Sequence, residues 1–251
     1  IMDISPNDPL LSEQWYLDAV NAPQAWEITS GDSTQVIGIL DTGVDYDHPD
    51  LTNKIWTNPG EIPDNGLDDD GNGFVDDIHG WDFVNDDNNP HDDNSHGTHV
   101  AGIAAAQSNN SVGISGIAWN SKIMPVKVFQ SSGYGSWSDV ASAIEYASDN
   151  GAQILNLSGG GYSESMVVKI AITNAYAGSG SGEGSILIAA AGNSYFKIDK
   201  PFPPYPFYAP MFPGCYGFVI GVEATDQSGQ NAPFSNFDPT GPILTDAWGF
   251  W

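Results

Sequence analysis

Residues 94–106 read Asn-Ser-His-Gly-Thr-His-Val-Ala-Gly-Ile-Ala-Ala-Ala and carry the strongest local signal in the chain. From Val100 onward the side chains are apolar and mostly small, with Ala and Gly at helical spacing, which predicts a helix buried at the centre of the fold. Ser95 or Asn94 can cap this helix, because a side-chain oxygen there accepts a hydrogen bond from a free backbone N–H. His96 then lies at the positive end of the helix dipole, which favours the neutral imidazole that a general base requires.

The two histidines of this stretch, His96 and His99, allow other interpretations. A pair of histidines three residues apart often serves in capping or core packing, and His-x-x-His can also bind a metal ion. These two residues alone therefore leave catalysis, packing and metal binding open.

The composition limits the classes of function. The 251 residues are 40% hydrophobic, enough for one large domain with a substantial core, and one cysteine, Cys215, excludes an intrachain disulfide. The net charge of −26 excludes nucleic acid as a partner, because phosphate binding requires clustered Lys and Arg. No apolar run approaches the length of a membrane span. The chain opens at Ile1 without a visible signal peptide, and we expect it to be part of a longer precursor.

A buried strand is expected at residues 36–40, and it ends in Asp41-Thr42-Gly43. In α/β sheets, chemistry is placed at the carboxyl ends of parallel strands. Asp41 could also belong to an ordinary turn, or to the Asp-Thr-Gly motif of aspartic proteases. Those enzymes need two such carboxylates, whereas Asp-Thr-Gly occurs once here, so we discount that alternative.

Strands and helices alternate along the rest of the chain, which predicts an α/β fold with a parallel sheet and right-handed crossovers. The expected strands cover residues 123–129, 154–157 and 185–191, and the expected helices cover residues 22–26, 136–150 and 164–177. The strand ends would then place Asp41, a loop near Gly133, Ser158 and Asn193 along one edge of the sheet.

The segment 60–93 is dense in Asp, Asn and Gly. Oxygen-bearing side chains and a glycine fall at places one, three, five, six and nine of an EF-hand-like loop, and place twelve is His79 instead of Glu. Without flanking helices, this pattern predicts a calcium loop of another type, in which a main-chain carbonyl takes part. A solvated acidic loop is the alternative. The residues concerned are Asp68, Asp70, Asn72, Gly73, Phe74 and Asp76.

Three segments in order resemble the subtilisin-like serine proteases: Asp-Thr-Gly at 41–43, Asn-Ser-His-Gly-Thr-His-Val-Ala-Gly at 94–102 and Ala-Ala-Ala-Gly-Asn at 189–193. The segment 81–96, which begins Trp-Asp-Phe-Val, is similar to the thermitase branch in both spacing and residues. The resemblance extends from about Asp8 to Asn236. It implies a single peptidase domain over residues 1–251, incomplete at the C-terminus, with an acidic calcium-binding insertion at 60–93. The implied fold is a three-layer sandwich with a mostly parallel central sheet flanked by helices.

The resemblance also assigns roles. His96 would be the general base and acid, Asp41 would orient it, and His99 would be a packing residue. Asn193 would donate its side-chain amide to the oxyanion. Trp137 would line an apolar pocket, and glycines around the cleft would leave room for an extended peptide to add as a strand. The backbone-pairing positions are Gly133, Gly135, Ser158 and Gly160, with Gly159 standing where the family usually has Leu.

Calcium is the implied cofactor, with one to three structural ions. One site would join the N-terminal arm to the loop at 109–113. A second would use Asp82 and Asp87, with His91 in place of a neutral oxygen ligand. The ligands implied for the first site are Asp8, Asp50, Asn110 and the carbonyls of Val112 and Ile114.

The family's nucleophile is missing, because no Gly-Thr-Ser-Met-Ala segment and no Gly-x-Ser-x-Gly occur in the chain. We therefore expect a fragment of a secreted, monomeric serine endopeptidase that is made with a propeptide and acts on peptides or proteins. The fragment alone should be inactive. The alternative is a non-catalytic calcium-binding or peptide-binding remnant of such a protease.

Overall fold

The computed structural model describes residues 5–178, 183–194 and 211–236. Its centre is a six-stranded sheet in the order β2-β3-β1-β4-β5-β6, in which every pairing is parallel. The strands are β1 (Val36–Asp41), β2 (Trp81–Asp82), β3 (Lys122–Lys127), β4 (Ile154–Leu157), β5 (Ile186–Ala190) and β6 (Val219–Val222).

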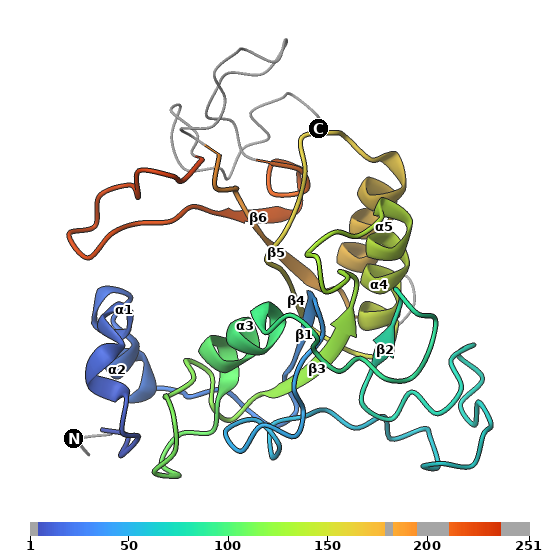
Figure 1. Cartoon of the computed structure of the whole chain (residues 1–251), viewed down its shortest axis with the longest axis horizontal. Helices are drawn as coiled ribbons and strands as arrows, with labels where there is room; N and C mark the ends of the chain where they lie inside the picture. The colour runs from blue at the N-terminus through green and yellow to red at the C-terminus, as the bar shows by residue number, and fades with distance from the viewer. Residues whose placement is uncertain (1–4, 179–182, 195–210, 237–251) are drawn as a thin grey trace.

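Helices cover both faces of the sheet, as Figure 1 shows, with α3 on one side and the adjacent pair α4 and α5 on the other. The predicted three-layer α/β sandwich is therefore confirmed. The helices are α1 (Trp15–Ala19), α2 (Ala22–Trp26), α3 (His96–Ala105), α4 (Trp137–Asp149) and α5 (Met166–Ala177), with a 3₁₀ turn at Leu11–Glu13.

Two apolar clusters fill the spaces between the layers. On the α3 side, Ala101 and Ala105 pack with Ile39 and Ile123, all fully buried. The small α3 residues let this helix lie close to β1, as the sequence predicted. On the other side, a larger cluster joins α4 and α5 to the sheet and includes Val126, Ile144, Leu155, Leu157 and Val168.

The predicted strands and helices of the α/β core are all present, with small shifts at their ends. Ser136 caps α4 by accepting a hydrogen bond from the Asp139 N–H at 3.1 Å, and Gly151 follows the helix with φ +83°. The sequence patterns did not indicate α1, β2 or β6. These are short elements of two to five residues, too short for hydrophobic periodicity to reveal them.

The capping of α3 differs from the prediction. Ser95 has a left-handed backbone (φ +83°) and makes no side-chain cap, and the Asn94 side chain donates to the Ser131 carbonyl instead. Asp92 takes the capping role, because its carboxylate accepts the Thr98 N–H at 2.9 Å and the Ser95 N–H at 3.0 Å. The residue that caps α3 therefore lies just before the segment 94–106, whereas the sequence predicted a cap within that segment.

Candidate active site

The candidate active site is built around two residues, one at the end of a strand and one at the start of a helix. Asp41 is the last residue of β1 and is fully buried, while His96 is the first residue of α3. Gly97 permits their approach, because a Cβ at that position would lie 2.0 Å from the Gly43 carbonyl oxygen. As a result, His96 Nδ1 lies 2.7 Å from Asp41 Oδ1.

This hydrogen bond determines the chemistry of the imidazole. A carboxylate oxygen accepts, so Nδ1 carries the hydrogen and Nε2 keeps its lone pair on a ring that is half exposed. The hydrogen bond to Asp41 raises the pKa of His96, against the opposing effect of partial burial. The carboxylate therefore outweighs the helix dipole, which had predicted a preference for the neutral ring.

The surroundings of Asp41 hold its carboxylate in place. The Thr42 N–H donates to Oδ1 at 2.8 Å, while Oδ2 is buried and has no hydrogen-bond partner among the described residues. Lys127, paired with Asp41 in the β1–β3 register, is 1% exposed and donates from Nζ to the Thr42 carbonyl at 2.6 Å and to Asp93 at 2.7 Å. Lys127 was not among the predicted site residues, although a lysine within an apolar strand run is a signal that could have revealed it.

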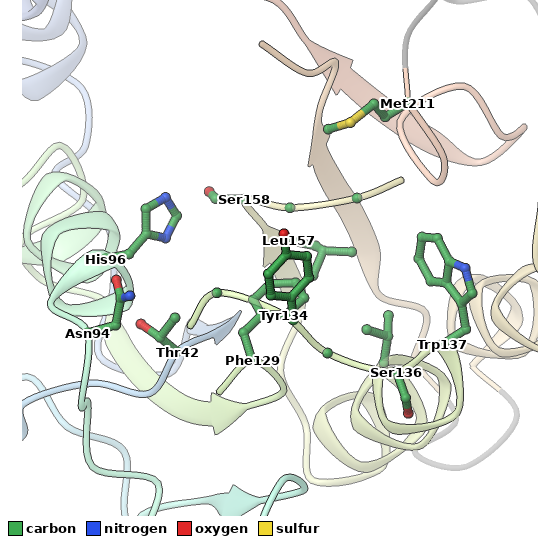
Figure 2. Close-up of a pocket in the computed structure, with 15 residues that line it drawn as sticks. Thr42, Asn94, His96, Phe129, Tyr134, Ser136, Trp137, Leu157, Ser158 and Met211 are labelled. Carbon is green, nitrogen blue, oxygen red and sulfur yellow. The ribbon is translucent and has the colours of Figure 1, made fainter. Parts of the chain in front are cut away.

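A cavity of about 340 Å³ opens beside His96. Figure 2 shows the His96 ring at one end and the Trp137 indole at the other, with Ser158 between them. The five residues assigned to peptide binding from the sequence all line this cavity, together with Phe129, Tyr134 and Met211, which no sequence motif had indicated. The five are Gly133, Gly135, Trp137, Ser158 and Gly160.

Packing within the protein also favours glycine at two positions of this cavity. A Cβ on Gly160 would lie 2.3 Å from the Phe212 carbonyl oxygen, and one on Gly159 would lie 2.6 Å from Phe129 Cζ. The Phe129 ring therefore occupies the space beside Gly159, where the family usually has Leu. Within the described residues, the backbones of Gly159 and Gly160 make no hydrogen bond, so their N–H and C=O groups are available to a ligand.

Asn193 follows β5 in an exposed loop. It is not among the described residues that line the cavity. Its assignment to the oxyanion remains a prediction.

Three of the five ligands predicted for the first calcium site are linked by hydrogen bonds, while the carbonyls of Val112 and Ile114 stay predicted ligands. Asp8 and Asp50 are 4% and 2% exposed, and Asn110 links them by donating from its backbone to Asp8 (3.3 Å) and from its side chain to Asp50 (2.7 Å). In the described part of the chain, no basic side chain pairs with either carboxylate. These two buried carboxylates accept hydrogen bonds from the 109–114 loop but have no cationic partner there, so the set fits calcium.

Carboxylates of the loop at 68–76 accept several backbone hydrogen bonds from the loop itself. The carboxylate of Asp68 accepts the N–H groups of Gly71, Asn72 and Gly73, and Asp76 accepts those of Asn65 and Gly66. Phe74 packs its ring on Trp81, Phe83 and Tyr146. The side chains of Asp68 and Asp76 therefore stabilise the loop, and the ring of Phe74 packs against other aromatic side chains.

Of the ligands predicted in this loop, Asp70 joins a convergent group of carboxylates with Glu61 and Asp77, and the Asn72 amide donates to Asp70 and Asp77. One oxygen from each carboxylate lies within 4.8 Å of the others. Asp77 is fully buried, and this burial raises its pKa, although hydrogen bonds from Tyr146, Asn58 and Asn72 oppose the effect. Glu61 and Asp77 lie outside the EF-hand-like spacing, so the motif could not indicate them.

The pair Asp82 and Asp87 is joined through its backbone, with N···O distances of 2.9 and 3.2 Å, and not through its carboxylates. Asp82 accepts hydrogen bonds from the Val84 and Asn85 N–H groups. His91 contacts Asp45 instead, with 3.3 Å between Nε2 and Oδ1. A calcium ion held by Asp82 and Asp87, with His91 nearby, stays a prediction.

Several known proteases resemble this chain over most of its length. Thermitase from Thermoactinomyces vulgaris is 38% identical over 234 residues, which cover 93% of this chain and 70% of thermitase. A thermophilic serine proteinase from Bacillus sp. (strain AK1) is 39% identical over 213 residues, 85% of this chain and 44% of that protein. Halolysin from Haloferax mediterranei is 37% identical over 235 residues, 92% of this chain and 38% of halolysin.

The chain thus spans less than half of two of these relatives. In the described part, no helix is long and apolar enough to cross a lipid bilayer. The profile of the Subtilase family matches residues 32–246, most of the sequence. The resemblance inferred from the motifs is therefore confirmed, and this chain belongs to the subtilase family.

Proposed function

We propose that this chain is part of a serine endopeptidase that hydrolyses peptide bonds, and that it supplies the aspartate and histidine of the catalytic triad. The observation that carries the proposal is the 2.7 Å hydrogen bond between His96 Nδ1 and the buried Asp41, at the mouth of a cavity with open backbone groups. In this arrangement Nε2 takes the proton of an attacking hydroxyl and later returns it to the leaving amine.

The hydroxyl would come from a serine in a segment that these 251 residues do not contain. Asp41 would stabilise the imidazolium that forms when Nε2 is protonated, and the raised pKa of His96 is consistent with that role. The Asn193 amide would donate to the oxyanion once the substrate and the serine are in place.

The substrate would be an extended peptide. The unpaired backbones at Gly159 and Gly160 favour a peptide that adds as a strand. The Trp137 indole and the Phe129 ring line the same cavity, and they favour an apolar side chain on the substrate upstream of the cleaved bond.

Calcium would be structural in this protein. The buried pair Asp8 and Asp50, with Asn110, fits one ion, and the group Glu61, Asp70 and Asp77 fits a second. Bound calcium would offset the cost of these buried charges and fix loops on both sides of β1. The protein would act as a secreted monomer made with a propeptide.

The test compares two proteins: the 251-residue chain and the same chain extended through the codons that follow Trp251 in its gene. We expect the short chain neither to cleave a fluorogenic peptide nor to react with a fluorophosphonate probe. The extended chain should do both, and His96→Ala in that chain should abolish cleavage.

Two results would contradict the proposal. One is peptide cleavage by the short chain that serine-directed inhibitors block. The other is a gene whose reading frame ends without a downstream serine segment, which would leave a calcium-binding or peptide-binding remnant.

A further inference from the structure

A second cavity, of about 490 Å³, lies along α3 and shares no described lining residue with the cavity beside the catalytic pair. It is lined by three of the five histidines of the chain, His48, His91 and His99. His99 is exposed there, in contrast to the packing role implied by the family resemblance. The mechanism proposed above uses none of these three side chains.

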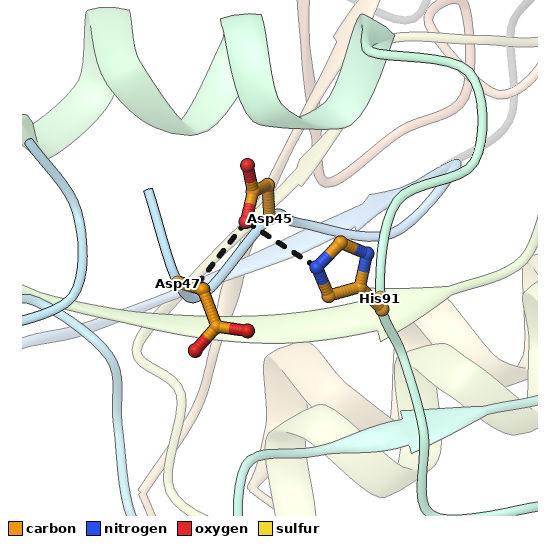
Figure 3. Close-up of side chains that lie close together, drawn as sticks. All are labelled: Asp45, Asp47 and His91. Carbon is orange, nitrogen blue, oxygen red and sulfur yellow. Dashed lines mark hydrogen bonds and ion pairs between the residues drawn. The ribbon is translucent and has the colours of Figure 1, made fainter. Parts of the chain in front are cut away.

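Two aspartates lie beside one of these histidines. Asp45, Asp47 and His91 each place one ligand atom within 4.8 Å of the others. Figure 3 shows the His91 ring pointing at the Asp45 carboxylate, with Asp47 on the far side of Asp45. Asp45 and His91 are each 38% exposed at the side chain, so an ion from solvent can reach them.

The hydrogen bonding of His91 directs one ring nitrogen at the Asp45 carboxylate. Its Nδ1 lies 3.2 Å from the Asp92 carbonyl oxygen, which can only accept, so Nδ1 carries a hydrogen. In the neutral ring, the Nε2 lone pair then faces Asp45 Oδ1 at 3.3 Å, and this oxygen is also an acceptor. Two acceptors facing each other need either a proton or a cation between them.

Metal-binding histidines characteristically donate their other N–H to a backbone carbonyl or carboxylate, which fixes the ring and its tautomer. His91 already makes this contact with Asp92. The Tyr46 ring also packs edge-on against the imidazole, with 4.9 Å between ring centroids, and restrains it further.

We propose that Asp45, Asp47 and His91 bind one divalent transition-metal ion, for which Zn²⁺ is the natural probe. One imidazole and two carboxylates suit Zn²⁺ and its first-row neighbours, whereas calcium takes oxygen ligands. Water completes the coordination, because the cluster faces a solvent-accessible cavity. Asp50, a ligand of the first proposed calcium site, lines the same cavity but does not belong to this cluster.

Such an ion would join the two segments that carry the catalytic pair. The Asp45 N–H donates to Thr98 Oγ1 at 2.9 Å, and Thr98 in turn donates to Asp92. Asp92 also accepts from Thr42, the neighbour of Asp41. Metal binding at Asp45 and His91 therefore ties the loop after β1 to the loop before α3, and we expect it to raise the melting temperature.

The test titrates Zn²⁺ into the calcium-saturated 251-residue chain by calorimetry, and Co²⁺ by visible absorption. We expect saturable binding of one ion by the wild-type chain. His91→Gln and Asp45→Asn should each weaken binding at least tenfold, and Asp47→Asn should weaken it measurably. His79→Gln is the matched control, because this histidine lies outside the cavity, and it should bind as the wild type does.

Circular dichroism establishes that each variant is folded. Asp45→Asn preserves the oxygen that accepts the Asp47 N–H, so this variant keeps the local turn even if another variant fails to fold. The proposal is overturned if no saturable Zn²⁺ binding is found, because Nε2 then simply holds a proton. It is also overturned if His79→Gln weakens binding as much as His91→Gln, or if His96→Ala abolishes binding that His91→Gln leaves intact.

Discussion

At the Asp41–His96 pair, one hydrogen bond sets both the tautomer and the basicity of the imidazole. Because the pKa of His96 is raised above 6.5 in the folded chain, this pairing stabilises the fold fully below pH 6.5. Its contribution is lost as the pH rises through the raised pKa. The same interaction makes His96 a stronger base towards a hydroxyl proton.

Replacing Asp41 with Asn tests this account without changing side-chain size. We expect the pKa of His96 to fall, because the negative charge is removed and an amide oxygen is a weaker acceptor than a carboxylate. Measurement is by NMR titration of the imidazole protons of the 251-residue chain. Asp18→Asn, in α1, is the control and should leave the His96 titration unchanged. An unchanged titration in Asp41→Asn would show that the hydrogen bond to Asp41 does not control this ring.

The cavity wall at Gly159 makes a second test possible. A Cβ on Gly159 would lie 2.6 Å from Phe129 Cζ, so Gly159→Ala must displace the Phe129 ring. We expect this to cost about 1–3 kcal/mol of unfolding free energy, the usual range for overpacking. Urea unfolding measures it. Phe129→Leu in the same chain should relieve the contact, so the double variant should cost less than the sum of the two single variants. Additive costs would contradict the proposed contact.

Asp92 caps α3, the helix that carries His96. Burial alone would raise the pKa of Asp92, but hydrogen bonds from Thr98, Asn94 and Thr42 lower it overall. The stability that this carboxylate contributes is therefore present above pH 3.8 and is lost as the pH falls through the lowered pKa. The cap also connects α3 to the residue that follows Asp41.

Asp92→Ala removes this cap, and we expect a loss of roughly 0.5–2 kcal/mol of unfolding free energy. Asn94→Ala, at a position that the sequence alone favoured as a cap, should cost much less because its side chain contacts only the Ser131 carbonyl. Chemical unfolding at neutral pH compares the two. If Asn94→Ala is the more damaging, the helix is capped from Asn94, as the sequence had predicted.

The elements differ in how far the sequence could predict them. Buried strands such as β1 and the long helix α4 follow from runs of apolar residues, and the motif around His96 identified its partner Asp41. Helix caps and metal-ligand groups were harder to predict from the sequence, because they depend on contacts between segments. Asp92 caps a helix from three residues before its N-cap residue, Ser95, and Glu61 meets Asp77 across a folded loop.

The chain contains 32 acidic and 6 basic residues. Cations can therefore stabilise it in two ways, by general screening of charge and by binding at specific sites. Any salt screens the repulsion between surface carboxylates. In our proposal, calcium would add specific binding where carboxylates are buried, as at Asp8 and Asp50. The first effect depends on ionic strength alone, and the second depends on the identity of the ion.

We therefore expect CaCl₂ to raise the melting temperature more than NaCl does at the same ionic strength. At a calcium concentration about one hundred times the Kd, binding adds about 2.7 kcal/mol, which is roughly 5–11 °C for a domain of this size. Asp50→Asn should remove most of this calcium-specific gain and keep the response to NaCl. Asp64→Asn, an exposed aspartate in the acidic segment, should keep both. Identical melting temperatures in the two salts would mean that screening alone stabilises the chain, and that the buried carboxylates hold no calcium.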